Sequence, residues 1–93
     1  MAIGSVRHKA LKRWCDKGDE SKLPADLAEK IKRILTSLDA ATAPEDLDLP
    51  GYSLHKLRGD RAGQYAIRVN GNWRIVFRFE GDQPEEVDLV DYH

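Results

Sequence analysis

The spacing of apolar residues changes along the chain, from a helical repeat in the first half to alternation in the second. Apolar residues recur every three to four positions in two segments: Val6, Ala10, Leu11 and Trp14 in the first, and Leu27, Ile31, Ile34, Leu35 and Leu38 in the second. Gly18 stands where the first helix should stop, and Pro24 stands near the first helical position of the second. The pattern predicts two amphipathic helices, followed by a further helical turn at 44–47.

From Tyr52 onward the apolar period is two, which is typical of strands. Residues 65–70 and 73–80 alternate most clearly, and Asn70-Gly71 between them is a hairpin turn signal. Gly81-Asp82 marks the next turn, the chain around Val87 and Leu89 predicts a last strand, and residues 52–57 predict a shorter first one. We expect an α+β fold with two N-terminal helices on one face of a mainly antiparallel sheet of four to five strands, residues 2–6 being the candidate fifth.

The length of 93 residues leaves room for one domain, spanning 1–93. No run approaches the roughly 18 apolar residues that a membrane-spanning helix needs, and the N-terminus lacks the apolar stretch of a signal peptide. Cys15 is the single cysteine, so no internal disulfide can form, and beside Trp14 it is interpreted as a small core residue. We therefore expect a cytoplasmic protein with no membrane partner.

The net charge of -1 conceals a strong segregation of charge along the chain. Residues 1–13 hold four cations and no anion, and residues 52–78 hold six cations against Asp60 alone, whereas residues 80–93 hold six anions and no Lys or Arg. Such a distribution places a positive surface beside a negative one, which the net charge does not reveal. A nucleic-acid partner is therefore compatible with the composition, although a solvated surface would show the same pattern.

Candidate chemistry centres on His55, Asp91 and His93. On an extended strand Asp91 and His93 would project to the same face, and a carboxylate beside an imidazole favours the protonated, acid form. Two chemistries remain open: a two-histidine, one-carboxylate metal site, or metal-free acid and base groups for RNA cleavage. Nearby cations favour the second, because they repel a metal ion and attract a phosphodiester.

The sequence resembles the HigB toxins of the RelE/ParE superfamily. Three segments carry the resemblance in order, PGYSLHKLRGD at 50–60, NGNWRIVFRF at 70–79 and the ending DYH at 91–93, and RHKALKR at 7–13 is similar as well. There are departures: Lys56 stands where relatives often have proline, Arg58 where lysine is common, and Leu89-Val90 replaces a more polar or aromatic pair.

The resemblance implies a RelE-like fold with a curved sheet, and a type II toxin that cuts mRNA in the A site of the 70S ribosome. It implies no metal and no cofactor, and it implies a neighbouring helix-turn-helix antitoxin of the HigA type as partner. The catalytic residues implied are His55, Asp91, Tyr92 and His93, beside Arg58 and Arg74 as basic positions near the RNA. To these we add Lys56 and Arg68 as expected phosphate contacts, and as ribosome-docking residues Arg7, Lys9, Lys12 and Arg13.

The expected reaction uses the RNA's own 2′-hydroxyl as nucleophile, with base and acid drawn from His55, Asp91 and His93 without individual assignment. Tyr92 would orient the sugar-phosphate or stack on a base. Two other readings stay open: a ParE-like gyrase-poisoning toxin, which shares the fold, and a non-enzymatic RNA-binding module.

Overall fold

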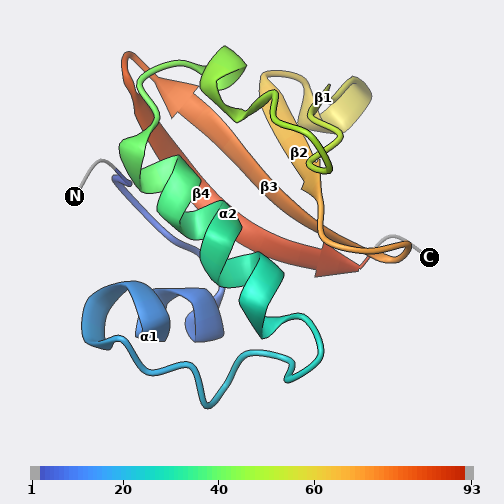
Figure 1. The fold of residues 1–93 in the computed structure, drawn as a ribbon. Coiled ribbons are helices and arrows are strands. Elements are labelled where there is room, and N and C mark those ends of the chain that lie inside the picture. The colour runs from blue at the N-terminus through green and yellow to red at the C-terminus, as the bar shows by residue number, and fades with distance from the viewer. Residues whose placement is uncertain (1–2, 92–93) are drawn as a thin grey trace.

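A computed structural model describes residues 3–91 and places two helices on one face of a curved, four-stranded antiparallel sheet (Figure 1). The elements are α1 (Lys9–Lys17), α2 (Ala28–Ala40), the 3-10 turn η1 (Pro44–Leu47), β1 (His55–Lys56), the 3-10 turn η2 (Gly59–Arg61), β2 (Gln64–Arg68), β3 (Trp73–Glu80) and β4 (Gln83–Asp91). The strands lie in the order β1-β2-β3-β4. The predicted α+β fold is confirmed, and no helix within 3–91 is long and apolar enough to cross a membrane.

Helix α1 begins later than the apolar repeat predicts. His8 caps it, because the His8 Nδ1 accepts a hydrogen bond from the backbone N–H of Ala10 at 3.2 Å. Gly18 ends the helix as predicted, with a left-handed φ of 69° that glycine adopts without strain. Val6 lies outside the helix and forms a parallel bridge with Val87. The candidate fifth strand is therefore a short parallel pairing along the β4 edge, and Arg7 belongs to it rather than to α1.

Helix α2 supplies most of the helical side of the core. It begins at Ala28, because Pro24 forms a separate turn in which its carbonyl oxygen accepts the N–H of Leu27 at 3.0 Å. All five residues of its predicted apolar repeat are buried, and they pack with apolar side chains of the sheet: Ile67, Val69, Ile75, Phe77, Val87 and Leu89. This packing fixes which face of the sheet the helices cover.

The predicted first strand is reduced to His55 and Lys56. Gly51 and Ser53 both have positive φ, 83° and 49°, so the chain turns where a strand would need extended backbone. Tyr52 is buried instead, and its hydroxyl lies 2.9 Å from Ser37 Oγ on α2. This turn brings β1 to the free edge of β2.

The turn η1 is held by one carboxylate. Asp46 accepts the backbone N–H groups of Thr42 at 3.0 Å and Ala43 at 3.3 Å, and also the Thr42 hydroxyl. These hydrogen bonds to the charged form, led by the one from the Thr42 backbone, lower the pKa of Asp46 below its usual value.

Replacing Asp46 with asparagine is expected to lower the melting temperature at neutral pH, because the amide is the weaker acceptor. The pKa of Asp46 is lower in the folded state than in the unfolded chain, where it is about 4. The stabilisation of the fold by the Asp46 carboxylate is therefore complete above the unfolded-state pKa and is lost as the pH falls through the folded-state pKa. The difference in melting temperature between wild type and Asp46→Asn should therefore shrink as the pH is lowered below about 4. A difference that stays constant with pH would contradict this role.

Candidate functional site

The register of the sheet defines a second face, which we call the helix-free face. Side chains alternate along each strand, so residues between the core positions point away from the helices. Two rows of residues in register cross this face from strand to strand. The first row consists of His55, Ala66, Val76 and Asp88. The second row consists of Arg68, Arg74 and Val90. Ala66 and Val76 are 1% exposed although they lie outside the main core cluster, so the face has a small apolar centre beneath its polar side chains.

Arg68 and Arg74 lie directly opposite each other on β2 and β3, one row away from His55. Like charges in this position repel, and an anion bound between them would relieve the repulsion. The Arg74 guanidinium also donates to the carbonyl oxygens of Asn70 at 2.6 Å and Trp73 at 3.1 Å, so it is anchored over the hairpin turn. The structure thus brings His55, Arg68 and Arg74 together on one face, and that face is suited to a phosphate group.

Asp91 ends the described part of β4, where it is exposed and pairs with Trp73. His55 and Asp91 belong to the two outer strands, three strand spacings of about 4.8 Å apart, so their backbones are separated by roughly 14 Å across the sheet. In register, the carboxylate in the row of His55 is Asp88. Ligands to one metal ion must converge to about 2 Å from it, so this separation of His55 and Asp91 does not favour a shared metal site.

Tyr92 and His93 lie outside the described residues. Their predicted roles, and the prediction that Asp91 and His93 share a face, therefore stay predictions. The other two basic candidates, Lys56 and Arg58, are exposed. Lys56 pairs with Tyr65 and so alternates to the other side of β1 from His55, whereas Arg58 directly precedes the turn η2. Lys56 is therefore less well placed for a ligand on the helix-free face than Arg68 or Arg74.

The basic N-terminal segment is partly neutralised by acidic residues that follow it. Lys12 pairs with Asp16 at 3.2 Å and Arg13 with Asp19 at 2.8 Å, and the hydrogen bond from Arg13 holds the pKa of Asp19 well below its usual range. Arg7 lies 3.8 Å from Glu86. A shallow hollow of about 290 Å³ over α1 is nevertheless lined mainly by cations: Lys9, Lys12, Arg13 and Lys17, with Asp16.

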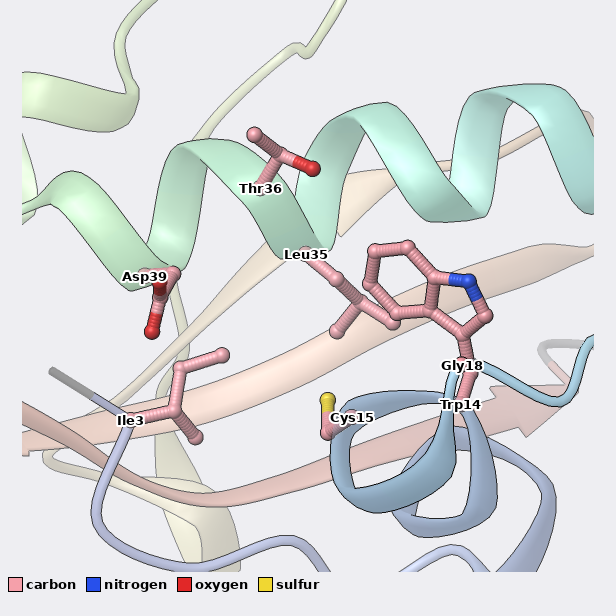
Figure 2. A pocket seen from close by; sticks show the side chains of 7 residues that line it. All are labelled: Ile3, Trp14, Cys15, Gly18, Leu35, Thr36 and Asp39. Carbon is pink, nitrogen blue, oxygen red and sulfur yellow. The ribbon is translucent and has the colours of Figure 1, made fainter. Parts of the chain in front are cut away.

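A second cavity, of about 300 Å³, lies between α1 and α2 (Figure 2). Ile3, Trp14 and Leu35 line it with apolar surface, and Asp39 and the Cys15 thiol lie at its wall. Burial raises the pKa of the Cys15 thiol, which favours the unreactive protonated form at neutral pH. This agrees with the interpretation of Cys15 as a packed residue rather than a nucleophile.

Sequence reasoning left two residues of the helix-free face without a role. Asp88 is half-buried and its Oδ1 accepts the N–H of Leu89 at 2.9 Å, and Arg78 binds two glutamates. The alternation of β3 puts Arg78 on the same face as Arg74 and Glu80, but its contact with Glu86 depends on an irregular register between β3 and β4 that no turn signal reveals.

Comparison with known proteins identifies relatives over the whole chain. The family described as RelE-like toxin of type II toxin-antitoxin system HigB matches residues 4–93. "Endoribonuclease HigB" of Proteus vulgaris is 40% identical over 91 residues, which covers 98% of this chain and 99% of the relative. "Toxin HigB-1" of Vibrio cholerae is 36% identical over 58 residues, 61% of either chain.

Solved structures with the same fold include a chain of a "YoeB-YefM complex from Staphylococcus aureus", with a TM-score of 0.62 and 18% identity. A "YoeB/ParE toxin from Agrobacterium tumefaciens" superposes with a TM-score of 0.61 and 21% identity. Both alignments cover 100% of this chain and 99% of the other chain. At this level of identity the similarity establishes the RelE/YoeB-like fold.

Proposed function

Since this chain belongs to the RelE-like HigB toxins of type II toxin–antitoxin systems, we propose that it is an endoribonuclease that cuts mRNA in the ribosomal A site. The observation that carries the proposal is the basic row Arg68–Arg74 beside His55 on the helix-free face. That face offers cations to a phosphate and an exposed imidazole for proton transfer. The full-length similarity to the Proteus endoribonuclease supports the reaction class.

The proposed reaction is a transesterification within the RNA. A base removes the proton of the 2′-hydroxyl, the 2′-oxygen attacks the adjacent phosphorus, and the bond from phosphorus to the 5′-oxygen breaks as an acid protonates that oxygen. The products are a 2′,3′-cyclic phosphate and a 5′-hydroxyl end. His55, Asp91 and His93 supply the acid and the base, Tyr92 orients the sugar-phosphate, and the reaction uses no metal and no cofactor.

The basic row would bind the phosphate between these groups. Arg68, Arg74 and Val90 form the row next to His55, and they lead across the sheet to β4 just before Asp91. An RNA strand laid across the face would therefore run from His55 at one edge to the chain end at the other, with its phosphate over Arg74. Arg74 and Arg58 would stabilise the negative charge that develops on the pentacoordinate phosphorus.

The ribosome would supply what a small domain lacks. Holding the mRNA in a fixed geometry replaces a bimolecular encounter with an oriented one, and such orientation contributes several orders of magnitude to a rate. We assign docking on ribosomal RNA to the cation-lined hollow over α1 and to Arg7, where Lys9 and Lys17 add positive charge beyond the pairs that Lys12 and Arg13 form.

A type II toxin has an antitoxin partner, and for this chain we propose a helix-turn-helix antitoxin of the HigA type that neutralises it in the cytoplasm. The acidic residues near Asp46 and Glu85 are available for that contact.

The proposed function can be distinguished from the two alternatives, a gyrase-poisoning toxin and an RNA-binding module, by adding the purified protein to translating ribosomes and, separately, to DNA gyrase with DNA. The account predicts new mRNA 5′ ends in a primer-extension assay on ribosomes and no double-strand breaks in gyrase-bound DNA. Gyrase-dependent breaks without mRNA cleavage would establish a ParE-like toxin, and RNA binding without either product would establish a binding module.

A further inference from the structure

The turn at residues 51–52 joins the edge of the sheet to α2. The Tyr52 carbonyl oxygen accepts the backbone N–H of Arg68 at 2.8 Å, at the end of β2. The neighbouring Gly51 carbonyl oxygen accepts a hydrogen bond from Lys30 Nζ on α2 at 2.9 Å. The buried Tyr52 side chain also reaches α2, because its hydroxyl donates to the Arg33 carbonyl oxygen at 3.4 Å. Lys30, Arg33 and Arg68, which we call the edge cations, are therefore held around one turn.

The edge cations are close enough to affect one another electrostatically. Burial lowers the pKa of Lys30, and the positive charges of Arg68 and Arg33 lower it further. Within residues 3–91 no ion pair includes any of the three side chains. Like charges gathered in this way repel, and an anion bound among them would relieve the repulsion.

The carboxylates of the adjoining segments do not pair with the edge cations. Glu29, next to Lys30 in sequence, pairs with Lys32 at 3.1 Å. Asp26 before α2 and Asp48 before the turn are exposed, and in the described part of the chain neither forms an ion pair with an edge cation. Asp88 shares the helix-free face with Arg68 but lies on β4, two strands away. The positive charge at this edge is therefore available to an incoming anion.

Arg68 connects the edge cations to the helix-free face. It lies between two core residues of the sheet, Ile67 and Val69, so its side chain points away from the helices, whereas Lys30 and Arg33 belong to α2 on the other side. Strand β1 pairs with β2 only at Tyr65 and Ala66, and beyond them the loop that holds the turn at 51–52 lies against β2 (Figure 1). Positive charge thus continues from the helix-free face around the edge of the sheet to α2.

We propose that Lys30, Arg33 and Arg68 form a phosphate-binding site that holds the backbone of the mRNA strand where it leaves the helix-free face across this edge. The inference rests on the proposed function and extends the RNA path beyond the reacting groups. Proteins that bind single-stranded RNA use cations that follow the backbone. The half-buried Lys30 is fixed by its hydrogen bond to Gly51, and the two exposed arginines approach the strand from the two sides of the edge.

The test compares wild type with Lys30→Gln and with Arg33→Gln in binding a short 2′-O-methyl oligoribonucleotide, which lacks the nucleophilic hydroxyl and stays intact. Each phosphate contact that is lost makes the dependence of log affinity on log salt shallower by about 0.7 for a single strand. Lowering the salt from about 200 to 50 mM should therefore strengthen binding by about 2.6-fold less in each variant than in wild type. Arg33 is exposed on α2 and its side chain forms no ion pair among the described residues, so Arg33→Gln keeps the test valid if Lys30→Gln disturbs the turn.

Lys22→Gln is the matched control. Lys22 is an exposed cation in the loop before α2, and it is not among the charges that lower the pKa of Lys30. The salt dependence of this variant should equal that of wild type. Unchanged slopes in both test variants, an equal change in the control, or no binding of the oligoribonucleotide by wild type at about 50 mM salt would overturn the inference.

Two parallel measurements distinguish this inference from its neighbours. If the oligoribonucleotide slopes are unchanged but Arg33→Gln binds mRNA-free ribosomes more weakly, the edge cations contact ribosomal RNA and the assignment to the mRNA strand is wrong. Cleavage of ribosome-bound mRNA by wild type is measured separately. Its absence would refute the proposed function alone, because the slopes report on the phosphate site whether or not RNA is cut, whereas cleavage with unchanged slopes refutes only the phosphate site.

Discussion

Replacing His55 with alanine is expected to slow mRNA cleavage on purified ribosomes by about 10²- to 10⁴-fold, the usual contribution of one general acid or base. His55 is exposed at the start of β1 and lies one row from Arg68 and Arg74. Because its side chain is not part of the core, the melting temperature of His55→Ala should stay close to that of wild type. The loss should appear in the single-turnover rate of cleavage with saturating ribosomes.

His8→Asn is the matched control for this substitution. His8 caps α1 through its Nδ1, and asparagine is among the preferred capping residues, so the helix should be retained. It removes an imidazole from another part of the molecule and should leave the cleavage rate unchanged. If His55→Ala cut mRNA as fast as His8→Asn does, His55 would be neither the acid nor the base.

The second large effect is on stability: Phe77→Ala should lower the free energy of unfolding by about 3–5 kcal/mol. Phe77 is fully buried in the middle of β3, and its ring stacks on Tyr65 with the centroids 5.8 Å apart and meets the edge of Phe79 at 6.0 Å. Domains have a total stability of about 5–15 kcal/mol, and a chain of this size lies toward the low end, so much of the population should unfold.

Urea denaturation measures this loss, with Phe77→Leu as the milder substitution that keeps most of the apolar volume. The leucine variant should be clearly more stable than the alanine variant and should keep its cleavage activity, because the helix-free face is untouched. A loss below about 1 kcal/mol for Phe77→Ala would mean that the sheet does not depend on this ring.

The regular parts of the fold could be predicted because local pattern and tertiary packing agree in them. The repeat from Leu27 to Leu38 is buried as expected, and Asn70-Gly71 connects β2 to β3 in the predicted hairpin. Prediction was wrong where a local backbone feature overrides the pattern. Val6 continues the helical repeat of α1, but the His8 cap starts the helix after it. Likewise, positive φ values at Gly51 and Ser53 shorten the first strand.

The sequence names candidate residues for the site but does not specify how they lie relative to one another. Alternation within their strands indicates that Arg68 and Arg74 point away from the core positions, and the register of the sheet shows that they share a face with His55. The separation of His55 from Asp91 follows from the order of the strands, which a sequence pattern does not specify. The contact of Arg78 with Glu86 follows from the irregular pairing of β3 with β4, where the insertion of one residue decides which side chains meet.

The most direct test of the account is cleavage mapped by primer extension on ribosomes whose A site is either empty or occupied by a tRNA. The protein is added to both complexes and to the same mRNA without ribosomes. The account predicts cuts within the A-site codon only when the A site is empty, with cyclic phosphate at the new 3′ ends. Equal cutting of free mRNA, or cuts that do not move when the A-site codon is moved along the message, would contradict it.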